Sequence, residues 1–69
     1  MSTHYDPGIV YNKLHHIFPP GYKPWHRVSH KHVVIRVFDL ELARYLAREF
    51  PGSPIRRDGD YQTVTIPLT

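Results

Sequence analysis

Two proline-rich stretches divide this chain into short segments. The first is "FPPGYKP", residues 18–24, and the second is "PGSP", residues 51–54. Proline fixes φ and lacks the N–H that a helix interior or a paired central strand needs, so neither kind of element can run through these stretches. We therefore expect regular structure before residue 19, between residues 25 and 50, and after residue 54. The stretch over 19–24 is expected to be a stiff connector.

The first segment, "DPGIVYNKLHHIF", predicts a short helix over residues 7–18. Asp6 is a suitable N-cap, and Pro7 stands at the first helical position, where proline is favoured. Four apolar residues then recur at helical spacing: Val10, Leu14, Ile17 and Phe18.

The middle segment predicts a strand followed by a helix. In "HKHVVIRVF" the apolar residues fall on both faces of an extended chain, which is typical of a central strand or of one covered at a homodimer contact. "DLELARYLAREF", residues 39–50, predicts the main helix, capped by Asp39. If the strands before and after this helix were parallel neighbours, the unit would be a right-handed crossover.

The last segment, "IRRDGDYQTVTIPL", predicts a β-hairpin that turns at Asp58-Gly59. Pro67 indicates an edge position or the end of a strand. The expected fold is therefore a single α+β domain in the order α-β-α-β-β, with about three strands packed on helix 39–50. Residues 1–27 would form a helix plus a proline-rich basic arm, and residues 28–69 a β-α-β-β core. The predicted core residues are Val33, Ile35, Val37, Leu40, Ala43, Leu46, Ala47, Phe50, Val64 and Ile66.

Composition narrows the class of protein. A chain of 69 residues is expected to form one domain. It has no cysteine, which excludes disulfides and thiolate metal sites and fits a reducing compartment. The N-terminal residues do not resemble a signal peptide, and the longest apolar run is far too short for a membrane span. These features predict a cytoplasmic protein with no membrane partner.

The charge of the chain is unevenly distributed. The net charge is +3, and no acid occurs between Asp6 and Asp39, a window that holds five cations and five of the six histidines. A one-sided positive field attracts phosphate groups or an acidic protein surface. The simpler alternative is a solvated surface that keeps the protein soluble.

The candidate binding residues are the cations and the aromatic residues beside them. They are Tyr22, Lys23, Trp25, Arg27, Lys31, Arg36, Arg44, Arg48, Arg56 and Arg57. Tyr22, Trp25 and Tyr61 are suited to stacking on bases next to these cations. Some of these residues also have a structural alternative. A lone tryptophan can close the core of a small domain, and Arg44 and Arg48 can pair with glutamates on a solvated helix face.

Three histidines in "HRVSHKH" are candidates for metal binding. His26, His30 and His32 lie within seven residues, and imidazole suits zinc, copper or nickel. No carboxylate is close in sequence, and surface histidines beside a proline-rich turn are the simpler explanation of the pattern. We therefore assign no metal and no other cofactor, and we keep these three residues as the candidates for one.

The pair His30 and His32, ahead of an apolar strand, resembles the HUH arrangement of rolling-circle nucleases. In that family two histidines hold a metal beside a tyrosine nucleophile, and the resemblance would give that role to Tyr45. It covers only three residues, and Lys31 stands where the motif has a bulky apolar residue. No nucleophile elbow or phosphate loop is present, so we expect the protein not to be an enzyme.

These features predict a small non-catalytic protein that occupies a partner's surface through a basic and aromatic face. Such a protein would be an inhibitor or adaptor of a nucleic-acid-handling protein, as small phage-encoded inhibitors are. The alternative is a nucleic-acid-binding module that contacts phosphates, and the second alternative is a histidine metal site. Because the sequence has no known nucleic-acid-binding signature, an acidic protein surface is slightly favoured as the partner.

Overall fold

The computed structural model describes residues 4–18 and 25–69, so the connector predicted over 19–24 lies outside the described residues. The chain forms two helices and four strands. In order they are α1 (Pro7–Ile17), β1 (Trp25–Val28), β2 (His32–Val37), α2 (Leu40–Glu49), β3 (Ile55–Asp58) and β4 (Tyr61–Pro67). The protein is thus a small α+β domain, as the sequence predicts, with one strand more than expected.

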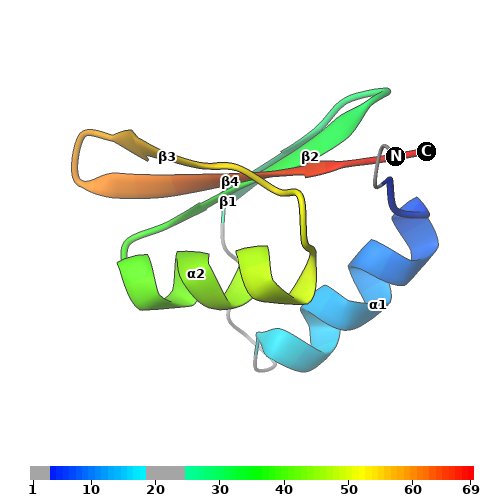
Figure 1. Ribbon diagram of the computed structural model, residues 1–69, viewed down its shortest axis with the longest axis horizontal. Coiled ribbons are helices and arrows are strands. Elements are labelled where there is room, and N and C mark those ends of the chain that lie inside the picture. The colour runs from blue at the N-terminus through cyan, green and yellow to red at the C-terminus, as the bar shows by residue number, and fades with distance from the viewer. Residues whose placement is uncertain (1–3, 19–24) are drawn as a thin grey trace.

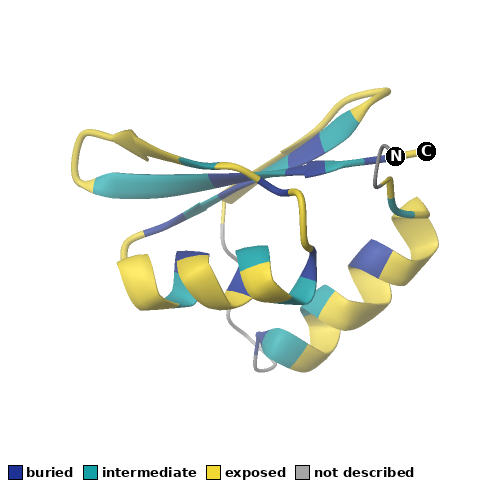
Figure 2. Ribbon diagram, in the orientation of Figure 1, coloured by how far each residue is buried: buried dark blue, intermediate teal, exposed yellow. Residues whose placement is uncertain are grey.

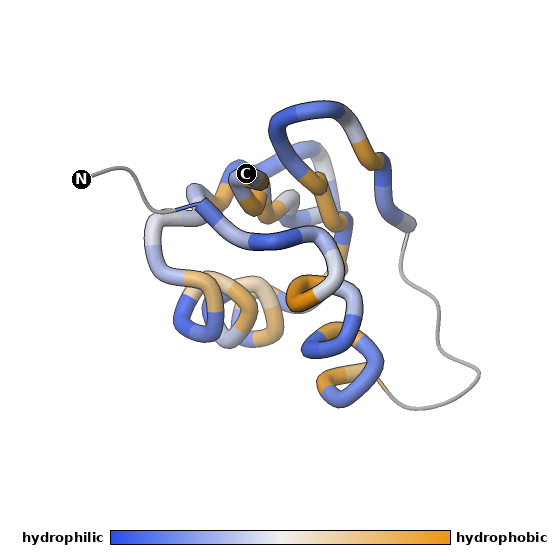
Figure 3. Tube along the Cα trace, turned by 90° about the vertical axis from the view of Figure 1, so that its right-hand side faces the viewer, coloured by the Kyte–Doolittle hydropathy of each residue, from blue (hydrophilic) through white to orange (hydrophobic). Residues whose placement is uncertain are grey.

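The four strands form one antiparallel sheet in the order β1-β2-β4-β3. Both helices lie on the same side of this sheet (Figure 1). A perpendicular view keeps the helices and the strands in two separate layers (Figure 3). Among the described residues, no helix covers the opposite side of the sheet, which we call the open face.

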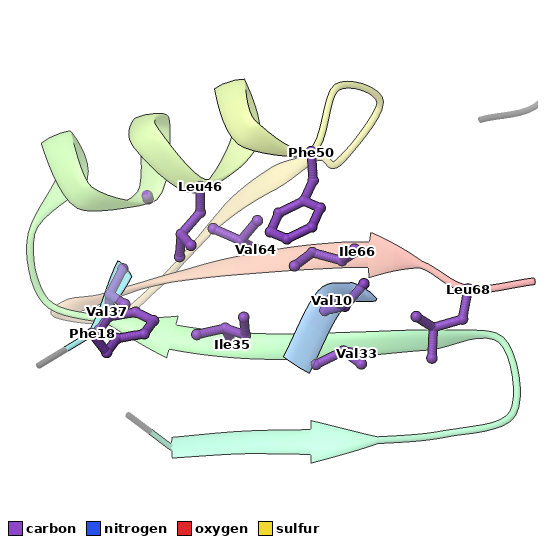
Figure 4. Close-up of a cluster of buried hydrophobic side chains, with 11 residues drawn as sticks. Val10, Phe18, Val33, Ile35, Val37, Leu46, Phe50, Val64, Ile66 and Leu68 are labelled. Atoms are coloured by element: carbon purple, nitrogen blue, oxygen red, sulfur yellow. The ribbon is translucent and has the colours of Figure 1, made fainter. Parts of the chain in front are cut away.

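The core lies between the two layers (Figure 2). Side chains from β2, β4, α2 and α1 meet there (Figure 4). The buried apolar residues are Val10, Phe18, Val33, Ile35, Val37, Ala43, Leu46, Phe50, Val64, Ile66 and Leu68. Eight of the ten predicted core residues are in this set. Of the other two, Ala47 is half-buried and Leu40 is 42% exposed, because Leu40 opens α2 at the rim of the layer.

Both helices begin as their sequences predict. The Asp6 carboxylate accepts a hydrogen bond from the Gly8 N–H at 2.9 Å, and the Asp39 carboxylate accepts one from the Glu41 N–H at 3.0 Å. Each bond satisfies a donor that the first helical turn leaves without a partner. Helix α1 packs into the common core, where its Val10 side chain is fully buried.

The segment before α1 lies beside the end of β4. Tyr5 forms a parallel bridge with Leu68: its N–H donates to the Pro67 carbonyl, and its own carbonyl accepts from the Thr69 N–H, both at 3.0 Å. The Tyr5 ring meets the Phe50 ring edge to face, with 5.3 Å between centroids. These contacts tie α1 to the sheet and to the end of α2.

The predicted order α-β-α-β-β is wrong in one element, because β1 is a strand and the sheet has four strands, not three. The predicted division places residues 25–27 in a basic arm and begins the β-α-β-β core at residue 28. Strand β1 is only four residues long and fully exposed, so it lacks the apolar alternation that marks a half-buried strand. The turn after it has no glycine, proline or asparagine. It is closed by Ser29, whose hydroxyl donates to the His32 carbonyl at 3.1 Å and accepts from the His32 N–H at 3.3 Å.

The sheet also settles three points that the sequence left open. Strand β2 lies between β1 and β4, so the strand with apolar residues on both faces is a central one. Strand β2 pairs antiparallel with β4 and does not neighbour β3, so no parallel crossover forms. Pro67 ends β4, which is the other central strand. The β3–β4 loop is Gly59-Asp60, one residue later than predicted, since Asp58 pairs with Tyr61.

None of the helices in the described part of the chain is long and apolar enough to cross a membrane.

Candidate functional site

The pairing register decides which side chains stand on the open face. Val33, Ile35 and Val37 of β2 are buried under the helices, so the alternating residues between them point the other way. One row of paired residues crosses all four strands on this face: Trp25, Arg36, Thr63 and Arg56. A second row holds Arg27, Val34 and Thr65, and Asp58 pairs with Tyr61 on the other side of the first row.

Three of these side chains, together with Phe38, form a continuous stack. The Arg36 guanidinium lies 4.4 Å from the centroid of the Trp25 ring and 5.1 Å from that of Tyr61. The Tyr61 ring packs on the Phe38 ring, with 4.3 Å between centroids and 35° between planes. The stack therefore runs Trp25, Arg36, Tyr61, Phe38, with one cation among three rings. Each cation–π contact at such a site contributes about 0.5–2 kcal/mol.

The two members at the ends of the stack are the exposed ones. Trp25 is 50% exposed and Phe38 is 68% exposed, whereas the side chain of Arg36 is only 33% exposed and Tyr61 is half-buried. A large ring exposed to this degree is not a packing residue. Trp25 thus does not close the core, which was the structural alternative for a lone tryptophan.

Positive charge dominates the open face. Arg27, Arg36 and Arg56 stand on it from three different strands, and Asp58 is an acidic residue on the same face. An Asp58 carboxylate oxygen lies 3.5 Å from an Arg36 guanidinium nitrogen. The Arg36 Nε atom is buried and has no hydrogen-bond partner. The pair leaves Arg27 and Arg56, both exposed, on the two outer strands that flank the stack.

The structure separates the predicted binding residues into groups. Trp25, Arg27, Arg36 and Arg56 stand on the open face. Arg57 follows the opposite alternation in β3, and Lys31 lies in the loop between β1 and β2. Arg44 and Arg48 are exposed on α2, in the other layer of the molecule. Tyr22 and Lys23 lie outside the described residues.

Phe38 and Asp58 lie on the open face, although neither is among the binding residues that the sequence predicts. The sequence places Phe38 in an extended stretch with apolar residues on both faces, and it places Asp58 in the hairpin turn. Strand alternation from the buried Val37 places Phe38 on the open face, so its side was readable from the sequence. The contact of Phe38 with Tyr61 could not be read from the sequence, because it depends on the register between β2 and β4.

The three candidate metal ligands do not meet. His26 pairs with buried Ile35 on the helix side of the sheet, His32 alternates onto the open face, and His30 lies in the loop between them. Within residues 4–18 and 25–69, no three histidine, aspartate or glutamate side chains are grouped as a metal site would require. The HUH-like arrangement is also not assembled, since Tyr45 is exposed on α2 in the opposite layer from His32.

The outer surface of α2 carries a second cluster of charged residues. Glu41, Arg44, Tyr45 and Arg48 line a shallow hollow there. A hydrogen bond and the negative charge of Glu49 raise the pKa of the Tyr45 hydroxyl above its ordinary value of 10.0. Because acids and cations alternate on this surface, it has less excess positive charge than the open face.

No protein-family model, curated protein or solved structure matches the chain.

Proposed function

We propose that the protein is a non-catalytic nucleic-acid-binding module and that the open face of its sheet is the contact surface. The observation that carries this proposal is the Trp25–Arg36–Tyr61–Phe38 stack, with exposed rings at both ends. Aromatic rings beside arginines on an exposed surface are the side chains that bind nucleic acid without requiring a sequence signature.

The cations on this face have the positions that phosphate contacts need. Arg27 and Arg56 are exposed on β1 and β3, the two edges of the sheet. A nucleic-acid strand that crosses the face therefore meets one of these arginines on each side of the stack. Contacts to phosphate supply affinity and orientation but read no sequence. Binding is therefore expected to depend strongly on salt and weakly on sequence.

The second candidate function is binding to an acidic protein surface, as an inhibitor or adaptor. It is favoured by the same residue types, because tryptophan, tyrosine and arginine dominate the energy of protein interfaces. Trp25 and Arg36 would be the anchors, supported on the sheet by their contact of 4.4 Å. A protein partner would show salt dependence mainly in its association rate, whereas loss of an aromatic anchor would raise the dissociation rate.

The two functions are separated by direct binding to nucleic acid. Binding of a labelled single strand and a labelled duplex would be measured by fluorescence anisotropy at about 50 and 200 mM salt. For a single strand, the log–log slope of affinity against salt is about −0.7 for each phosphate contacted. No binding to either probe at about 50 mM salt would contradict the nucleic-acid function and leave the acidic protein surface as the partner.

The location of the surface is tested by two variants of equal charge. Arg27→Gln with Arg56→Gln removes two cations from the open face, and Arg44→Gln with Arg48→Gln removes two from α2. Each double variant lowers the net charge from +3 to +1, so any effect of overall charge is the same. The open-face variant is expected to flatten the slope by about 1.4 and weaken binding on the order of tenfold. An equal or larger loss in the α2 variant would contradict the proposed location.

A further inference from the structure

We propose that the ligand is single-stranded nucleic acid whose bases stack on the two ends of the open-face stack, one on Trp25 and one on Phe38. This inference rests on the proposed function and adds to it the strandedness of the ligand and the residues that hold the bases. It follows from which parts of the stack are already satisfied and which are not.

The interior of the stack is occupied by the protein's own contacts. Arg36 lies within cation–π distance of two rings, Trp25 and Tyr61, and it also pairs with Asp58. Tyr61 has Arg36 on one side and the Phe38 ring on another. Arg36 and Tyr61 therefore offer less free surface to a ligand ring than the two end residues do. A ligand ring can stack most readily on the ends.

The end rings remain open to solvent. Trp25 and Phe38 are the two most exposed aromatic residues in the described part of the chain, at 50% and 68%. Phe38 follows buried Val37, and the alternation of β2 turns its ring away from the core. Leaving such a ring in water costs hydrophobic free energy that burial would recover, and rings gathered beside cations are typical of a binding surface.

A nucleobase fits both ends, and only a single strand can offer it. In a duplex each base is stacked between its neighbours, so its faces are not available to a protein ring without unstacking. Bases of a single strand can be splayed onto aromatic side chains, and each stacked base contributes a sequence-tolerant share of the affinity. The strand's phosphates would then pass Arg27 and Arg56 at the edges of the sheet.

The protein contains its own probe for this geometry. Trp25 is the only tryptophan in the chain, so intrinsic tryptophan fluorescence reports on the open face alone. Three probes of equal length would be titrated into the full chain at about 50 mM salt: an oligothymidylate, an abasic strand with the same number of phosphates, and a duplex. The oligothymidylate is expected to quench Trp25 and bind most tightly, while the abasic strand binds more weakly and quenches little.

A pair of matched variants tests the second end of the stack. Phe38→Ala removes a ring on the open face, and Tyr45→Ala removes a ring of 44% exposure on α2. Phe38→Ala is expected to weaken oligothymidylate binding by about 5- to 150-fold, the effect of losing one base stack. It should leave abasic-strand binding unchanged, and Tyr45→Ala should change neither. Because both side chains are exposed, thermal unfolding of each variant should match that of the parent protein.

The outcomes distinguish this inference from the function on which it rests. If the abasic strand binds as tightly as the oligothymidylate, or the duplex binds more tightly than both, base stacking is overturned while nucleic-acid binding stands. If Phe38→Ala weakens both single strands equally, the ring does not act on bases and the inference is also overturned. If none of the three probes binds, the proposed function and the inference fall together.

Discussion

Asp58 and Arg36 face each other across one intervening strand of the sheet, with 3.5 Å between a carboxylate oxygen and a guanidinium nitrogen. They come from β3 and β2, which are separated by β4. The Asp58 side chain is 63% exposed and that of Arg36 is 33% exposed. So exposed a pair adds little to folding, about 0–1 kcal/mol, but it neutralises the cation at the centre of the stack.

Asp58→Asn is therefore expected to strengthen binding of single-stranded nucleic acid with little effect on folding. Two unit charges about 4 Å apart in water interact by about 1 kcal/mol, which corresponds to an affinity gain of about fivefold at low salt. The control is Asp60→Asn, in the loop of the same hairpin, which raises the net charge from +3 to +4 in the same way. Anisotropy titrations that show equal gains in the two variants would mean that the Arg36 pair has no special role.

The helix-on-sheet core makes a second prediction, on stability. Leu46 is fully buried between α2 and the sheet, whereas Leu40 in the same helix is 42% exposed. Leu46→Ala is expected to lower the free energy of unfolding by about 2–5 kcal/mol, which is most of the stability of so small a domain. Leu40→Ala removes the same atoms and should cost far less. Urea denaturation followed by Trp25 fluorescence measures both, and similar losses would contradict this packing.

Strong local signals made α2 and most of the core predictable from the sequence. The helix has an aspartate cap, an apolar stripe and a proline stop, and each of these acts within a few residues. The β3–β4 hairpin was predictable for the same reason, because Gly59 allows a positive φ that few other residues adopt. The buried face of β2 followed from alternation alone.

The open-face stack was not predictable, because it is assembled by pairing between distant segments. Trp25 meets Arg36 only because β1 is a strand, and β1 has too few apolar residues to indicate one. Tyr61 was a candidate for base stacking, but nothing local places it between Arg36 and Phe38. The arginines of α2 and those of the sheet were equally good candidates for binding, because the sequence does not tell in which layer of the molecule an arginine lies.

The third prediction concerns Gly8 and Gly59, whose replacement by alanine should have opposite effects on stability. Gly59 opens the β3–β4 loop with φ of 62°, so Gly59→Ala forces a side chain into the left-handed region and should destabilise the fold by about 1–2 kcal/mol. Gly8 lies in the first turn of α1, where an added Cβ meets only the Asp6 carboxylate at 3.6 Å. Gly8→Ala should therefore stabilise the protein by about 0.4–1 kcal/mol. Thermal melts that shift in the same direction would contradict one of the two conformations.

The last prediction concerns the alkaline titration of Tyr45. Glu49 raises the pKa of the Tyr45 hydroxyl above 10.0, first through a hydrogen bond and then through its charge. Glu49→Gln removes the charge and weakens the acceptor, so the pKa of Tyr45 should fall toward 10.0 when its ring is followed by NMR. Glu41→Gln, on the same surface, is the control and should leave the pKa of Tyr45 unchanged.

The raised pKa of Tyr45 belongs to the folded state. The stabilisation of the fold by this hydroxyl is therefore complete below the unfolded pKa and is lost only as pH rises through the folded one. Between about pH 6 and 9, unfolding of the parent and of Glu49→Gln should therefore show no difference in pH dependence due to Tyr45. An unchanged Tyr45 titration in Glu49→Gln would show that the hydrogen bond does not form.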